Sequence, residues 1–168
     1  ISLLRNSHDG FTDNVSNGQD LDDADSFSAR VKLLWQASDN VTVKLGAQMF
    51  DEDVNGQAQK GIYDPTPGAR RLAQDSRSAY ELKSEIYSAT VEWDLPNFTL
   101  KSITSYQSDD ILVLRDNDRH DPTTLPPFFL LQSYFDPETN DQTTTTQEFN
   151  LISSTPAFGK LDWVAGVF

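Results

Sequence analysis

Apolar and polar side chains alternate with a period of two on both sides of a short break at residues 38 to 40. The residues before the break that share one face are Phe27, Ala29, Val31, Leu33 and Trp35, and those after it are Val41, Val43, Leu45, Ala47 and Met49. Successive side chains of a strand point to opposite faces, so this period predicts β-strands rather than helices. We expect two antiparallel strands, 26 to 37 and 41 to 49, joined by a turn at Asp39 and Asn40, with Leu34 as the one apolar exception on the polar face.

The same pattern occurs twice more along the chain. One predicted hairpin covers residues 86 to 108 with a turn at Pro96 and Asn97, and another joins residues 147 to 153 to residues 161 to 167. The opening sequence ISLLR is interpreted as the tail of one more strand. The sequence therefore predicts an all-β chain, an antiparallel meander of about seven strands.

The connections between these strands alternate between short and long. The short ones are tight turns, whereas the long ones cover residues 6 to 25, 51 to 84 and 109 to 143 and are polar. Structureless connections beyond roughly 12 to 15 residues are uncommon in compact domains unless they carry function or are disordered. Short turns at one end and long loops at the other are typical of a large transmembrane β-barrel, with short periplasmic turns and long extracellular loops.

Aromatic residues gather near the ends of the apolar stretches. Those near the short turns are Trp35, Trp93, Phe98 and Trp163, and those near the other ends of their strands are Tyr87 and Tyr106. Amphipathic aromatic rings concentrate at membrane interfaces, so these six are predicted interface residues. Alternation and terminal aromatics also occur in a soluble β-sandwich, for example a carbohydrate-binding module, which stays open as an alternative.

Composition excludes several classes of function. The net charge is −13, with 13 basic and 26 acidic residues, so we expect no nucleic-acid partner. The chain has no cysteine, which excludes a disulfide-stapled fold. It also contains no run of roughly 18 apolar residues that would form a membrane-spanning helix. It begins and ends within predicted strands, and we expect it to be a fragment of something larger.

No motif predicts catalysis. The two histidines, His8 and His120, fall in predicted loops without a serine nucleophile motif or a zinc motif nearby, so we expect no enzyme. Paired carboxylates are abundant but uninformative at this net charge, and a glycosidase stays an unsupported alternative. We expect no catalytic residue and no cofactor.

Two groups of residues resemble metal ligands. Asp51, Asp53, Asn55 and Gly56 match the start of a calcium loop, but position twelve is Ile62 where a glutamate is required. The second group lies in one loop and combines hard and borderline ligands; it contains Asp116, Asp118, His120 and Asp121. We favour an acidic turn at the exposed end of a strand for the first group and a solvated loop for the second, and predict no metal site.

Two loops carry further expectations. Residues 9 to 25 hold six aspartates and no basic residue, and we favour a solvated loop over divalent-cation bridging to lipopolysaccharide. LPPFFLLQSYF, residues 125 to 135, is the most apolar loop segment. Either it folds into a barrel mouth or onto a plug, with Phe128, Phe129 and Tyr134 contacting ligand, or it extends a strand beyond the membrane.

Several segments resemble the barrel strands of TonB-dependent outer-membrane receptors. They are SFSARVKLLWQASDNVTVKL, YSATVEWDLPNFTLKSITSYQ and TQEFNLISSTPAFGKLDWVAGVF, of which the last is the most specific. The resemblance implies a barrel of about 22 strands with an N-terminal plug. It also implies active uptake of scarce nutrients, such as ferric siderophores, vitamins or oligosaccharides, across the outer membrane of a Gram-negative bacterium.

The partners implied by this resemblance are the TonB complex, reached through a plug, and outer-membrane lipid and lipopolysaccharide. The sequence contains no plug, no TonB-contacting segment and no closing strand, so residues 1 to 168 are expected to be a partial barrel domain. Seven strands leave open edges that lipid does not tolerate, and we expect the chain alone to be inactive in transport. A passive porin-like channel is the other membrane alternative.

Overall fold

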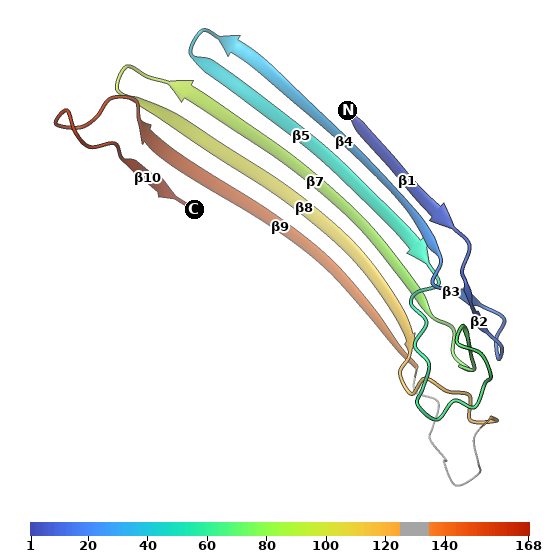
Figure 1. Ribbon diagram of the computed structural model, residues 1–168. Coiled ribbons are helices and arrows are strands. Elements are labelled where there is room, and N and C mark those ends of the chain that lie inside the picture. The colour runs from blue at the N-terminus through green and yellow to red at the C-terminus, as the bar shows by residue number, and fades with distance from the viewer. Residues whose placement is uncertain (125–134) are drawn as a thin grey trace.

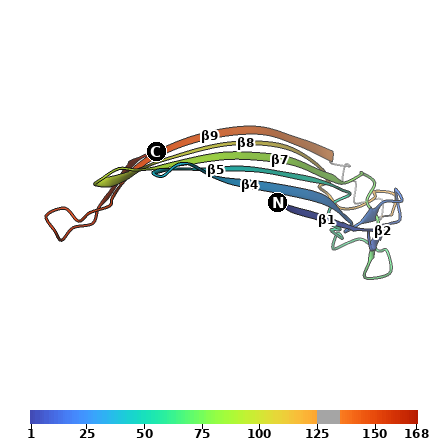
Figure 2. The ribbon, with the colours of Figure 1, turned by 90° about the horizontal axis from the view of Figure 1, so that it is seen from above.

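A seven-stranded antiparallel sheet forms most of the computed structural model, which describes residues 1–124 and 135–168. The order across the sheet is β1-β4-β5-β7-β8-β9-β10, so strands of this sheet that follow one another in sequence also lie side by side (Figure 1). The strands are β1 Ser2–His8, β4 Ala24–Ser38, β5 Val41–Val54, β7 Ala79–Asp94, β8 Phe98–Asp116, β9 Phe135–Ser153 and β10 Val164–Val167. Figure 2 shows the large sheet as a single curved layer.

The predicted all-β class and the meander of seven strands are confirmed, including the strand that contains ISLLR. The strands are longer than the sequence predicted. β8 and β9 each contain 19 residues and pair over their whole length, from Phe98 opposite Ser153 to Asp116 opposite Phe135. Periodicity underestimates them because backbone pairing continues through stretches such as residues 139 to 146, where every side chain is polar. The long connections are correspondingly shorter than predicted.

The register places the alternating apolar residues on one face, called here the apolar face. Residues paired across antiparallel strands share a face. One row joins Leu33, Leu45, Ala89, Thr104 and Gln147, and a second row joins Trp35, Val43, Val91, Ser102 and Phe149. Most of this face is open: Leu33, Trp35 and Leu45 are 55%, 58% and 43% exposed. The apolar face is therefore an extended apolar surface that the described residues leave uncovered.

Four polar residues of β8 and β9 interrupt the apolar face, and three of them bond to one another. The Thr104 hydroxyl donates to Oε1 of Gln147 at 2.6 Å, and Nε2 of Gln147 donates to the Ser102 hydroxyl at 3.0 Å. Thr145, the fourth, pairs with Tyr106. Polar groups that satisfy one another are far less costly beside apolar surroundings than unpaired ones. The interruption is thus compatible with an apolar environment.

The opposite face, called the polar face, carries charges that pair across strands. Nζ of Lys44 lies 3.0 Å from a carboxylate oxygen of Glu92, and Nζ of Lys101 lies 3.3 Å from the other oxygen. Arg30 Nε donates to Oε1 of Gln48 at 2.8 Å. Leu34 also lies on this face, opposite Lys44, as the alternation predicts.

The two ends of the large sheet differ in their connections (Figure 1). The turn end holds the tight turns at Asp39 and Asn40 and at residues 95 to 97, together with the connection from β9 to β10. The loop end holds a second sheet of three short strands in the order β3-β2-β6. These are β2 Thr12–Asn14, β3 Asp20–Leu21 and β6 Arg71–Leu72. The most buried apolar residues of the described chain, Leu21, Leu72 and Ala73, belong to this small sheet and its continuation.

The described residues form no α-helix. Accordingly, none of them belongs to a helix of the length and apolarity needed to cross a membrane.

Candidate functional site at the loop end

Three loops pack together at the loop end through buried polar side chains. Asn14, 2% exposed, donates from Nδ2 to the Gln74 carbonyl and accepts from the Gln74 amide, both at 3.0 Å. Gln19 donates from Nε2 to the Ser78 carbonyl at 2.8 Å and accepts from the Ser78 amide at 2.9 Å. Asparagine and glutamine bridge backbones in this way because their amides carry both donors and acceptors. The loop of residues 9 to 23 is thereby attached to residues 74 to 78.

This arrangement corrects the expectation of a solvated loop at residues 9 to 25. Thr12, Asn14, Gln19 and Leu21 are buried, each 5% exposed or less. The carboxylates of Asp22 and Asp23 accept hydrogen bonds from the amides of Ala58 and Asn55, both at 2.9 Å. Carboxylates that accept backbone N–H groups hold loops in place as charge-assisted bonds. Part of the acidic composition therefore serves loop structure.

A pocket of about 500 Å³ lies between these loops and the polar face of the large sheet. The strands contribute one wall, with Glu52 and Val54 from β5, Tyr80 from β7 and Val113 and Arg115 from β8. The other walls come from the three loops and include Asp22, Asp23, Gly56, Gln57, Gln59, Gln74, Ser78, Asn117 and Arg119. Cavities of this size, with a few convergent polar groups, are typical of small-molecule sites.

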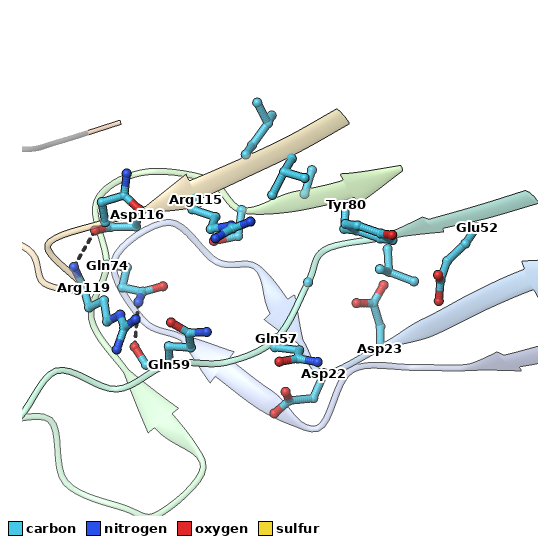
Figure 3. A pocket seen from close by; sticks show the side chains of 17 residues that line it. Asp22, Asp23, Glu52, Gln57, Gln59, Gln74, Tyr80, Arg115, Asp116 and Arg119 are labelled. Atoms are coloured by element: carbon cyan, nitrogen blue, oxygen red, sulfur yellow. Dashed lines mark hydrogen bonds between the residues drawn. The ribbon is translucent and has the colours of Figure 1, made fainter. Parts of the chain in front are cut away.

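Opposite charges occupy opposite ends of the pocket (Figure 3). Arg119 and Arg115 lie toward the end next to Asp116, whereas Glu52 and Asp23 lie at the other end, with Gln57 and Asp22 between. Asp22 and Arg119 both have positive φ, 61° and 58°, a conformation that L-residues seldom adopt. Such residues cluster at ligand sites because surrounding structure has to hold them there.

Asp116 is a buried carboxylate that holds two loops at the arginine end. It is 6% exposed, and its oxygens accept hydrogen bonds from the Ser76 amide at 3.2 Å and the Arg119 amide at 2.7 Å. Burial, together with the neighbouring Asp118 carboxyl, raises the pKa of Asp116 from its ordinary value of 3.8 to about 7. A group with this pKa changes its charge near neutral pH.

The loops at Asp116 are expected to loosen as the pH rises. The folded pKa lies above the ordinary value of 3.8, so the folded state binds the proton more tightly. The resulting stabilisation is complete below pH 3.8 and is lost as the pH rises through about 7. Hydrogen-exchange protection factors of the Ser76 and Arg119 amides should fall at least tenfold between pH 5.5 and pH 8.5, since one pKa unit corresponds to about 1.4 kcal/mol.

Asp116→Asn is the matched control for this pH dependence, because it keeps the shape and one acceptor oxygen but removes the titration. Its protection factors should be nearly constant between the same two pH values. An equal pH dependence in both proteins would contradict the assignment to Asp116.

The second predicted metal-like group is only partly brought together. Carboxylate oxygens of Asp116, Asp118 and Asp75 lie within 4.8 Å of one another, and Asp75 was not anticipated because it comes from another loop. His120 is 4% exposed, with Nδ1 3.3 Å from Oδ1 of Asp118. Asp121 instead accepts hydrogen bonds from the Thr123 amide and hydroxyl, which lower its pKa.

The calcium-loop pattern does not form a loop at its start. Asp51 and Asp53 lie within β5 and pair with Lys83 and Glu81 of β7. An EF-hand needs a twelve-residue loop whose first ligands converge on one point, which a strand cannot provide. The sequence match is therefore accidental, in agreement with the missing glutamate at Ile62.

The predicted interface aromatics fall into two groups along the strands. Trp35 pairs with Val43, Trp93 with Val41 and Leu100, and Phe98 with Ser153, all near the turn end. Trp163 is beside them, since its carbonyl accepts from the Ser153 amide at 2.9 Å. Tyr87 and Tyr106 pair with each other further along the strands, with ring centroids 6.4 Å apart. All six share the apolar face or its continuation. The predicted ligand contacts Phe128, Phe129 and Tyr134 lie outside the described residues.

Most of the residues that line the pocket were missed by sequence reasoning, and Asp116 and Gly56 were singled out only because they resemble metal ligands. Glu52 and Tyr80 were assigned to a long loop, yet they belong to β5 and β7. The available signal was weak: Val54, Tyr80 and Leu82 are apolar or aromatic side chains that lie on the polar face of their strands. An apolar patch on an otherwise polar face indicates a place where that face is covered.

No protein-family model, curated protein or solved structure matches this chain.

Proposed function

We propose that this chain is part of an outer-membrane transport barrel of the TonB-dependent type, with its apolar face toward lipid and its polar face toward the barrel interior. The observation that supports this most is the apolar face itself. It runs across the seven strands and stays exposed, although most of its side chains are aliphatic or aromatic. Monomeric soluble proteins rarely expose apolar patches beyond a few hundred Å².

The order of residues along the strands supports a bilayer rather than another apolar partner. Starting from the turn end, the apolar face passes from tryptophan through aliphatic residues to Tyr87 and Tyr106. The row after the tyrosines contains Met49, Glu85, Ser108 and Thr143, and in the row beyond it Asp51, Lys83, Asp110 and Asp141 lie side by side across four strands. Aromatic residues on both sides of an aliphatic band, with charges beyond, match the girdles of membrane β-barrels.

The pocket supports transport rather than a purely structural role. It opens at the end that carries the long loops and lies against the polar face, which in this arrangement borders the interior of the barrel. A solute captured there would stand at the outer entrance. Energy supply through TonB, a plug domain and uptake of a scarce nutrient are part of the proposal on the strength of the sequence resemblance.

The soluble alternative requires a second sheet over the apolar face. In the described part of the chain the second sheet contains three short strands, and it lies at the loop end instead. The porin-like alternative differs only in lacking a plug and a TonB requirement. Uptake that persists after deletion of tonB would favour the porin-like channel.

Tryptophan fluorescence provides the direct test of lipid contact. In vesicles, the Trp35 signal, obtained as the difference between the protein and its Trp35→Phe variant, should be quenched by lipids brominated near the headgroup more than by lipids brominated near the chain ends. The reason is that an indole at the interface lies close to the headgroups. On gels, the complete barrel protein that contains this chain should migrate differently before and after boiling, because seven strands alone do not close a barrel.

Two outcomes would contradict the proposal. Trp35 fluorescence that no brominated lipid quenches would show that the apolar face is covered by protein. Identical migration of boiled and unboiled samples, extracted from membranes, would show that no stable barrel is present.

A further inference from the structure

We propose that the pocket binds a short zwitterionic peptide, with its ammonium group at Glu52 and Asp23 and its carboxylate at Arg115 and Arg119. This inference deepens the proposed function, since it rests on it for the direction of uptake, but the binding chemistry follows from the pocket alone. The separation of acidic and basic side chains at opposite ends of the pocket is its main support (Figure 3).

At the acidic end, no cation of the described residues forms an ion pair with the carboxylates that line the pocket. Glu52 forms no hydrogen bond or ion pair with any residue in the described ranges, and both oxygens of Asp23 accept from the Asn55 amide. Asp22, next in the chain, accepts from Thr12 and Ala58. Neighbouring carboxylates repel one another, so a bound cation is favourable here. A peptide ammonium offers three N–H donors to acceptors placed around it.

The arginine end offers a free guanidinium. Within the described chain, the side chain of Arg119 has no hydrogen bond and no ion pair, while Arg115 has only a 3.9 Å contact with Glu138 between two exposed groups. Such exposed contacts contribute little. The planar fork of arginine matches a carboxylate with two parallel hydrogen bonds. Two arginines therefore provide a site for a terminal carboxylate.

The backbone that presents Arg119 is held in place by the neighbouring loop. A Cβ added at Gly61 would lie 2.7 Å from the Arg119 carbonyl oxygen, so the two loops are in direct contact. The Arg119 amide donates to Asp116 at 2.7 Å, which supports its positive φ. The backbone from which this guanidinium extends is thereby fixed before a ligand arrives.

Asp116 does not cancel the positive charge of this end. Both of its oxygens accept from backbone amides, and burial together with the Asp118 carboxyl raises its pKa to about 7, so it is partly protonated at neutral pH. Asp118, close to Asp116, has its Oδ1 3.3 Å from Nδ1 of His120, and that nitrogen also lies 3.1 Å from the Asp118 carbonyl oxygen. Arg115 and Arg119 are thus left available to an incoming anion.

The distance between the ends selects a peptide over a single amino acid. Glu52 of β5 is level with Ile111 of β8, two strands away. Arg115 lies four residues beyond Ile111 in β8. Strand spacing and rise place the two backbones roughly 16 Å apart. An extended chain covers roughly 3.3 to 3.6 Å per residue, so about two to four residues fit. The side-chain amides of Gln57 and Gln59 lie between the ends and suit peptide groups.

The test is a calorimetric titration of the protein, purified in detergent micelles, with trialanine, N-acetyl-trialanine and trialanine amide. Trialanine should bind, and each blocked peptide should bind at least tenfold more weakly, because blocking removes one terminal charge. No trialanine binding at 10 mM, or equal affinity for all three peptides, would overturn the proposal.

Two variants assign the ends. Glu52→Gln should weaken trialanine at least fivefold but leave N-acetyl-trialanine unchanged, and Arg119→Gln should weaken trialanine but leave trialanine amide unchanged. Glu81→Gln, which pairs with Asp53 on the other face of the sheet, is the matched control and should bind like the unaltered protein. If a variant weakens all three peptides equally, its residue does not contact a peptide terminus and the assignment is wrong.

The outcome is separable from that of the proposed function. If brominated lipid quenches Trp35 fluorescence and boiling changes the gel migration, but trialanine does not bind, the protein is a barrel with a different ligand. A protein that discriminates among the three peptides yet shows no lipid contact is a peptide-binding protein outside the membrane.

Discussion

Leu33→Arg is expected to prevent stable assembly in membranes, whereas Leu34→Arg one residue later is expected to assemble almost normally. The two leucines are adjacent in β4, and both are largely exposed, at 55% and 67%. Exposure therefore predicts no difference between them. Leu33 lies on the apolar face in the middle of the aliphatic band, where a basic residue facing lipid destabilises a barrel by about 2–4 kcal/mol.

Leu34 lies on the polar face opposite Lys44, and an arginine there meets water and one like charge. Repulsion between directly opposed like charges costs at most about 1 kcal/mol. Urea unfolding in vesicles, together with the fraction of heat-shifted protein on gels, measures both variants in the complete barrel protein that contains this chain. Equal destabilisation of the two variants would mean that the two faces have similar surroundings, which is incompatible with a membrane sheet.

Asn14→Ala is expected to detach the loop of residues 9 to 23 from residues 74 to 78. The substitution removes one donor and one acceptor from Gln74, whose backbone groups then have no partner in a site that is 3% exposed. Each unsatisfied buried group costs about 1–3 kcal/mol, so with two such groups the loops should lose about 2–6 kcal/mol of local stability. Trypsin cleavage after Arg70 and Arg71 should then become at least tenfold faster.

Asn6→Ala is the matched control, since Asn6 lies exposed in β1 and its side chain bonds to nothing in the described structure. Its cleavage rate should equal that of the unaltered protein. A cleavage rate in Asn14→Ala that also stays unchanged would mean that other contacts hold the loops.

The large sheet was predictable because side-chain periodicity and pairing register depend on the same geometry. Trp35, Leu33 and Val31 fall on one face in any strand of this sequence, and only the partner strand has to be found. Short turns decide that partner, as Asp39 and Asn40 do for β4 and β5. Strand length was less predictable, because pairing through the polar residues 139 to 146 gives no periodic signal.

The pocket was not predictable, because it depends on contacts between distant segments. Asp22 and Gly56 meet through a backbone hydrogen bond of 3.0 Å, and Asn14 meets Gln74 across 60 residues of sequence. The sequence around a single asparagine or glutamine does not indicate which distant backbone group it will bond to. The residues singled out for metal binding were recognised by type, and the structure joins two of them to Asp75 only through loop folding.

The small sheet also constrains the order in which the chain folds. β2 pairs with β6 in parallel, with Asp13 opposite Arg71 and Asn14 opposite Leu72, although β4 and β5 lie between them in sequence. Contacts between distant residues form late, because the entropy of closing the intervening loop has to be overcome first. The hairpin of β4 and β5 shortens that loop by bringing its ends to the same end of the sheet. The Asp13 and Val15 amides donate across this pairing to the carbonyls of Arg70 and Leu72. Protection of these two amides is therefore expected late in folding, in chains whose central hairpin has already reached its native register.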